Sequence, residues 1–153
     1  MNKPMYNKGL AIRRAVLGND YVDAQLKNAD DFNGPMQELV TEYCWGAVWG
    51  REGLNKKTRS MLNLAMISIL NRPHELKAHL RGALRNGVTK AEIREIFLQV
   101  AIYGGVPAAV DSFRIAREVF ADKPPQPRQR VTAKIQKGGT QIQKGGTSKS
   151  KLN

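Results

Sequence analysis

The sequence contains few of the residues that build disulfide, metal or redox sites. Cys44 is the only cysteine, and His74 and His79 are the only histidines among 153 residues. A single thiol forms neither an internal disulfide nor a CxxC pair nor a cysteine zinc site. Two histidines are too few for a metal site built of histidines alone. The glycines match neither the P-loop spacing nor the dinucleotide-binding spacing. We therefore expect a protein that needs no cofactor and no metal.

Long hydrophobic runs are also absent. The longest one, at 62–70, is interrupted by Asn63 and Ser68, and a membrane span needs about 20 apolar residues. The first residues, MNKPMYNKGL, contain no apolar stretch that could serve as a secretory signal. These absences predict a protein with no membrane partner and a cytoplasmic location.

Positive charge is plentiful but unevenly distributed. Of 25 Lys and Arg residues, seven lie between 124 and 153, together with none of the 13 acidic residues, so residues 1–123 carry 18 basic and 13 acidic side chains. The net charge of +12 is therefore largely a property of the C-terminal segment. It does not indicate a basic face on the folded part.

A proline-rich segment, KPPQP at 123–127, marks a boundary because proline cannot continue a helix. We predict a folded domain at 1–121 and a disordered Lys-, Gly- and Gln-rich tail at 122–153, in which IQKGGT occurs twice. Such a tail could contact nucleic-acid phosphates nonspecifically, but it has no aromatic residue to stack on bases. A solvated extension is the simpler interpretation, and a nucleic-acid partner is not expected beyond the tail.

The folded part is predicted to be all-α. Apolar residues recur at helical spacing and no alternating strand pattern with hairpin turns occurs. Asn55 is a predicted N-cap, Thr89 and Glu92 form a predicted capping box, and Gly87 ends a helix. The helix after Asn55 is apolar enough to be expected buried on most sides. The expected helices cover about 6–17, 20–29, 35–48, 55–70, 73–86, 89–103 and, after a break at 104–107, the stretch to 120.

The helix that begins at Pro73 carries the most suggestive polar group. Glu75 and His79 are four residues apart, so their side chains can touch at the edge of an apolar stripe, with Arg72 on the same border. A carboxylate beside an imidazole would orient the ring and raise its pKa, which suits a general acid or base. The alternative is an ordinary surface pair on a helix.

Four further residues have both a functional and a structural interpretation. Trp45, followed by Trp49, is either a wall of a substrate site or a core or oligomer contact. Arg59 either binds an anion or is solvated, and Tyr103 is either a donor beside a flexible glycine pair or a packed phenol. Cys44 is expected to be a small core residue, because no basic residue adjoins it in sequence.

Several blocks in the right order resemble the carboxymuconolactone decarboxylase family, and the resemblance covers roughly 6–120. The matching blocks are RRAVLG at 13–18, YVD at 21–23, DFNG at 31–34, WGAVWGREGL at 45–54, TRSMLNLAM at 58–66, LNRPHELKAHLR at 70–81, NGVTKAEIRE at 86–95 and AIYGGVPAA at 101–109.

This resemblance implies an all-α, alkylhydroperoxidase-D-like fold that assembles as a homo-oligomer, with a hexamer suspected. The implied reaction is the cofactor-free decarboxylation of 4-carboxymuconolactone, a dicarboxylate lactone, to the β-ketoadipate enol-lactone in protocatechuate degradation. As CO₂ leaves, its bonding electrons can pass through the ring double bond into the lactone carbonyl, so the substrate acts as its own electron sink.

The resemblance also assigns roles to the candidate residues. His79 would donate the proton and stabilise the oxyanion, with Glu75 orienting it. The surviving carboxylate would be held by a cation, for which arginine is well suited. Tyr103 is a second candidate donor and Trp45 a wall of the site. The cation candidates are Arg72, Arg51 and Arg59.

The sequence departs from the family pattern at Gly104, Val110 and Arg114, where Cys or Ala, Asn, and His are typical. If that histidine serves the site in relatives, the present chain has altered specificity or another proton route. Two alternative functions therefore stay open: a related lactone or small-acid enzyme, and a non-catalytic oligomeric binding protein that uses its basic tail.

Overall fold

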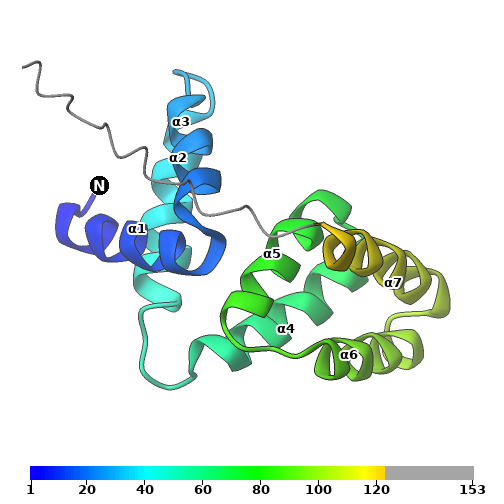
Figure 1. Cartoon of the computed structure of the whole chain (residues 1–153). Helices are drawn as coiled ribbons and strands as arrows, with labels where there is room; N and C mark the ends of the chain where they lie inside the picture. The colour runs from blue at the N-terminus through cyan, green and yellow to red at the C-terminus, as the bar shows by residue number, and fades with distance from the viewer. Residues whose placement is uncertain (123–153) are drawn as a thin grey trace, which may run out of the picture. The chain divides into compact units, whose positions relative to one another are not determined.

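A computed structural model describes residues 1–122 of the chain, and this part consists of helices joined by turns (Figure 1). The predicted all-α class is confirmed for these residues. The predicted tail lies outside the described residues, apart from Asp122. The elements are α1 (Lys3–Leu17), α2 (Asn19–Lys27), α3 (Gly34–Leu39), the π-helix η1 (Val40–Val48), α4 (Lys56–Ile69), α5 (Pro73–Arg85), α6 (Lys90–Tyr103) and α7 (Val106–Ala121).

Two hydrophobic clusters hold these helices together. One lies among α4, α5, α6 and α7, which form one group in Figure 1, and its fully buried side chains include Leu64, Leu80 and Phe97. The other joins α1 and α2 to η1 through residues that include Val16 and Trp45. The Arg85 guanidinium links the two groups by donating to the carbonyl oxygen of Leu17 at 2.7 Å.

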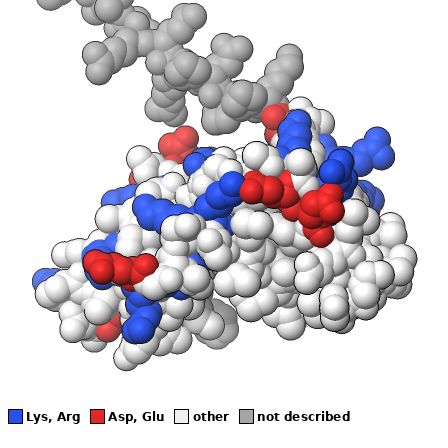
Figure 2. All heavy atoms as spheres, turned by 90° about the horizontal axis from the view of Figure 1, so that it is seen from below, with Lys and Arg blue, Asp and Glu red and all other residues white. Residues whose placement is uncertain are grey.

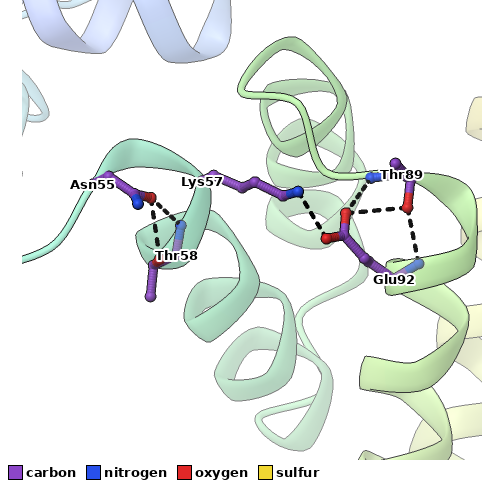
Figure 3. A network of polar contacts seen from close by, with 5 residues as sticks. All are labelled: Asn55, Lys57, Thr58, Thr89 and Glu92. Carbon is purple, nitrogen blue, oxygen red and sulfur yellow. Dashed lines mark hydrogen bonds and ion pairs between the residues drawn. The ribbon is translucent and has the colours of Figure 1, made fainter.

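Helix ends follow the predicted capping chemistry (Figure 3). The Asn55 side chain accepts from the Thr58 amide at 2.8 Å at the start of α4. The Thr89 hydroxyl accepts from the Glu92 amide at 3.1 Å, and Glu92 returns an acceptor to the Thr89 amide at 2.8 Å. Lys57 pairs with the other Glu92 oxygen at 2.7 Å, so the capping box also joins α4 to α6. The hydrogen bond from Lys57 has the largest effect on Glu92 and, together with the bond from the Thr89 backbone, lowers its pKa to about 2.

The segment predicted as one helix at 35–48 is two elements of different pitch. The α-helix α3 ends at Leu39 and the π-helix η1 follows directly. At the change from α-helix to π-helix, α1 approaches η1 closely. Gly9 of α1 lies against the main chain of η1. A Cβ at Gly9 would be 1.9 Å from the Thr41 carbonyl oxygen and 2.7 Å from the Gly46 amide nitrogen. The α1–η1 contact therefore depends on glycine at this position.

The composition of α4 predicted a helix buried on most sides, and this prediction is wrong. The outer face of α4 leaves Leu62, Met66 and Ile69 each about half exposed. Apolar residues at the end of α6 and the start of α7 are more exposed still: Ile102 is 78%, Tyr103 81% and Val106 60% exposed. Figure 2 shows a face on which charged side chains form a band and leave a broad uncharged area on the right, on the side of α6 and α7. Within residues 1–122, no helix is long and apolar enough to cross a membrane.

Candidate active site

A cavity of about 310 Å³ lies where η1 faces α4 and α5. Its wall is mainly apolar and aromatic, with two side chains, Asn63 and His79, that offer nitrogen atoms for hydrogen bonding. Small-molecule sites commonly have this composition, with a few polar groups that orient the ligand. The lining residues are Val40, Cys44, Trp45, Val48, Trp49, Asn63 and His79.

The π-helix supplies four of these seven residues, and Trp49, which directly follows it, is a fifth. Its i→i+5 hydrogen bonds widen the turn, and the lining residues Val40, Cys44 and Val48 recur every four positions along it. π-helical turns are rare and occur frequently at functional sites. Trp45 is almost fully buried and its ring centroid lies 4.8 Å from that of Trp49, so the two indoles form a rigid corner of the cavity.

His79 projects from α5 into this corner and lies parallel to Trp45. The ring centroids are 6.3 Å apart and the planes differ by 6°. The Asn63 amide nitrogen lies 3.5 Å from His79 Nδ1, a long hydrogen bond. Because an amide nitrogen only donates, Nδ1 is the acceptor in this arrangement, and the proton of the neutral ring is on Nε2.

Burial and charge act on His79 in opposite directions. Removal from water lowers the pKa of His79 from 6.5 to about 4, and the nearby Glu75 carboxylate opposes this by raising it. Burial has the larger effect, so the net shift is opposite to the one that the Glu75–His79 spacing predicted. At neutral pH the free protein therefore holds an uncharged imidazole in the cavity.

The structure brings together only some of the residues selected from the sequence. His79 and Trp45 line the cavity, and Glu75 lies one turn earlier on α5, exposed, with no hydrogen bond to His79 in the described part of the chain. Tyr103 lines a different hollow, of about 380 Å³, between α4 and α6.

The three candidate arginines do not line the cavity. Arg72 precedes the first residue of α5 and is exposed. Arg59 donates from Nε to the Leu54 carbonyl at 3.2 Å and from Nη2 to the Arg51 carbonyl at 3.2 Å, so its guanidinium braces the loop between η1 and α4. Arg51 is exposed in that loop. No Lys or Arg is among the residues that line the cavity.

Two lining residues were missed or misjudged from the sequence. Cys44 was expected in the core, but it is exposed and lines the cavity. Asn63 was noticed only as an interruption of an apolar run. A single amide between Leu62 and Leu64 in a strongly apolar helix was the signal that could have identified it.

The residues at which the sequence departs from the family pattern lie away from His79. Arg114 pairs with Asp111 at 3.0 Å on the exposed side of α7 and lines another hollow, as does Val110. A Cβ at Gly104 would lie 2.5 Å from Ile69 Cγ1, so glycine there allows α4 and α6 to approach. Within residues 1–122, no three His, Cys, Asp or Glu residues come together as a metal site would require.

Comparison with known proteins places the chain among decarboxylases. A sequence model of the carboxymuconolactone decarboxylase family matches residues 34–118, which include every residue of the cavity wall. The chain belongs to this family. The matched region begins with α3 and ends within α7.

Two known proteins are similar to this one over most of the chain, and a third over a shorter stretch. A 4-carboxymuconolactone decarboxylase of Acinetobacter baylyi is 42% identical over 117 residues, which are 76% of this chain and 87% of the relative. A nitrosuccinic acid decarboxylase of Metarhizium robertsii is 41% identical over 122 residues, 80% of this chain and 85% of that protein. A 4-carboxymuconolactone decarboxylase of Pseudomonas putida is 46% identical over 44 residues, which are 29% of this chain and 92% of the relative.

Proposed function

We propose that this protein is a carboxy-lyase that converts 4-carboxymuconolactone to the β-ketoadipate enol-lactone and CO₂. The observation that carries the proposal is a cavity of about 310 Å³ in which a sheltered imidazole faces two indole rings. This cavity lies within a chain 42% identical to a 4-carboxymuconolactone decarboxylase. The substrate carries two carboxylates, of which one leaves and one remains.

The chemistry suits a site built largely of apolar side chains. The bond between the ring carbon and the departing carboxylate breaks, CO₂ leaves, and the bonding electrons move through the ring double bond to the lactone carbonyl. The resulting dienolate takes one proton at the carbon next to that carbonyl, which completes the enol-lactone. An apolar wall favours loss of the charged carboxylate as neutral CO₂. Donors aimed at the developing oxyanion lower the barrier further.

In this proposal His79 supplies the proton. The imidazole of the free protein is neutral, since burial holds its pKa at about 4. A dianionic substrate brings negative charge beside the ring, which favours the imidazolium and raises the pKa. The ring then takes a proton from solvent as the substrate binds, gives it to the dienolate carbon, and returns to its neutral state. Glu75 assists by its charge. Asn63 orients the neutral ring through Nδ1, and in the imidazolium its amide oxygen replaces the nitrogen as the partner of Nδ1–H.

The experiment that tests the proposal is an assay with the purified protein and 4-carboxymuconolactone. We expect loss of the lactone absorbance with release of one CO₂ for each lactone consumed. Nitrosuccinate is the informative second substrate, because a relative of nearly equal identity is named for it. That compound is also a dicarboxylate, and its nitro group can accept the electrons that CO₂ leaves behind. Turnover of nitrosuccinate alone would move the substrate assignment, and turnover of neither compound would contradict the proposal.

We also propose that the protein works as a homo-oligomer. The support is the apolar residues exposed on α4, α6 and the start of α7, since large exposed apolar patches mark interaction sites. Ile69, Ile102 and Val106 are 48%, 78% and 60% exposed. A symmetric assembly would bury this face against other copies. The hexamer that the family resemblance implies is the arrangement we expect.

A further inference from the structure

Arg13 is a buried cation with no acidic partner among residues 1–122. Its residue is 5% exposed, on the face of α1 that contacts η1. Nη1 donates to the Thr41 hydroxyl at 2.9 Å and Nη2 donates to the Gln37 side-chain oxygen at 2.9 Å. Both acceptors are uncharged, and Nε has no hydrogen-bond partner.

The neighbouring arginine, Arg14, differs from Arg13 in both burial and pairing. Arg14 lies at the surface and pairs with Asp23 at 2.6 Å. Burial lowers the pKa of the Arg13 guanidinium, and within residues 1–122 no carboxylate forms an ion pair with it. A guanidinium stays charged in proteins, and a buried charge without a counter-ion is unfavourable. An anion bound nearby would offset this cost.

The position of Arg13 relates it to the cavity. Its two acceptors, Gln37 and Thr41, belong to α3 and η1, and Thr41 directly follows the lining residue Val40. Cys44 and Val48 of the same π-helix also line the cavity, so Arg13 is hydrogen-bonded to the element that forms this wall. The positive charge therefore stands behind the η1 wall of a cavity whose own lining has no Lys or Arg.

We propose that Arg13 is the cation that gives this cavity its preference for carboxylate ligands, acting through the η1 wall. The proposal rests on the decarboxylase function above, because it explains how a dicarboxylate is held at a site without a lining cation. Arg13 is a positioning residue in this account. It stabilises the bound anion by its field and holds η1 in register through Thr41 and Gln37.

Binding can be followed directly because the only two tryptophans, Trp45 and Trp49, line the cavity. Their fluorescence would be titrated with maleate, a dicarboxylate dianion that has no lactone ring, and with dimethyl maleate, its neutral ester. In the wild-type protein we expect maleate to bind more tightly than the ester. In Arg13→Gln we expect the affinity for maleate to fall about tenfold, equivalent to about 1.4 kcal/mol, with little change for the ester.

Three further measurements separate charge from structure. Arg13→Lys keeps the charge and should retain most of the preference for maleate. Thr41→Val removes one hydrogen bond and keeps the charge, so it should retain the preference as well. Arg14→Gln, the matched change at the exposed neighbour, should bind both probes as the wild type does.

The proposal is overturned if Arg13→Gln loses affinity for both probes equally, which is the result of a merely structural role. It is also overturned if the wild-type protein shows no preference for maleate, a result that does not depend on the folding of any variant. The lactone assay is separate. Maleate selectivity lost in Arg13→Gln, together with no turnover of 4-carboxymuconolactone, would sustain the Arg13 proposal and remove the proposed reaction.

Discussion

At the scale of single residues, His79 shows how the folded chain changes the chemistry of a side chain. In water a histidine has a pKa near 6.5. Here the loss of solvent outweighs the attraction of Glu75, and the pKa falls to about 4. The same burial makes the group responsive to a ligand, because a carboxylate entering the cavity meets a ring with little water to screen it.

This shift predicts a dependence of stability on pH. The unfolded chain takes up a proton on His79 near pH 6.5, whereas the folded protein does so only near pH 4. Stability from this group is therefore complete above about pH 6.5 and is lost as the pH falls toward 4. The loss is up to about 3 kcal/mol at 1.36 kcal/mol for each pKa unit. Urea unfolding at several pH values measures it.

The matched control is His79→Gln, which should lack this loss of stability between about pH 6.5 and 4.5. Glu92 does not interfere, because its lowered pKa removes stability only as the pH falls below its ordinary value of 4.5. Equal slopes for the two proteins across that interval would show that His79 is not buried in neutral form.

The sequence predicted the identity of this residue better than its environment. The spacing of Glu75 and His79 on one helix face and the position of Trp45 before a second tryptophan were sufficient to select them. Which side chains share a cavity depends on contacts between helices far apart in sequence. Asn63 meets His79 across 16 positions, and Arg13 meets Thr41 across 28, so periodicity within one helix could not bring either pair together.

At the scale of elements, local chemistry determined the helix ends and tertiary contact determined the pitch. The caps at Asn55 and at Thr89 with Glu92 lie where the sequence predicted them, because each involves residues three apart. The change from α3 to η1 was not predicted. Its residues are compatible with an ordinary helix, and the close approach of α1 at Gly9 is a long-range contact.

The contact between α1 and η1 predicts a large effect of Gly9→Ala. The new methyl group would meet main-chain atoms of Thr41 and Gly46, which cannot move without displacing the helix that lines the cavity. We expect the free energy of unfolding to fall by about 3 kcal/mol, the upper end of overpacking effects. Urea denaturation measures this change.

Gly34→Ala is the control for that substitution, since a Cβ at Gly34 meets nothing within 4 Å. It should leave the free energy of unfolding within about 0.5 kcal/mol of wild type. If both variants were equally stable, the close contact of α1 with η1 would be contradicted.

At the scale of the whole molecule, the described residues leave an apolar surface that a single copy does not cover. Composition could not reveal it. A helix rich in Leu, Met and Ile predicts burial equally well whether the partner is the same chain or another copy. The outward side of α4, once expected in the core, is the element on which this difference is visible.

A charge placed on that surface should separate the copies. Ile102→Lys introduces an ammonium where 78% of the residue is exposed, and burying it against a second copy would be unfavourable. We expect size-exclusion chromatography with light scattering to show a multiple of 17.0 kDa for the wild type and a shift toward 17.0 kDa for the variant. Ala11→Lys, on the exposed side of α1, should keep the wild-type mass. A wild-type mass of 17.0 kDa would contradict the proposed assembly.

The central claim is that His79 in its cavity performs the proton transfer of a decarboxylation. Its most direct test is the rate of 4-carboxymuconolactone consumption by the wild type and by His79→Gln, with circular dichroism and tryptophan fluorescence showing that the variant keeps its fold. The account predicts that kcat falls by about 10²–10⁴ in the variant, the usual contribution of a general acid. A folded His79→Gln protein that turns over the lactone at the wild-type rate would contradict it.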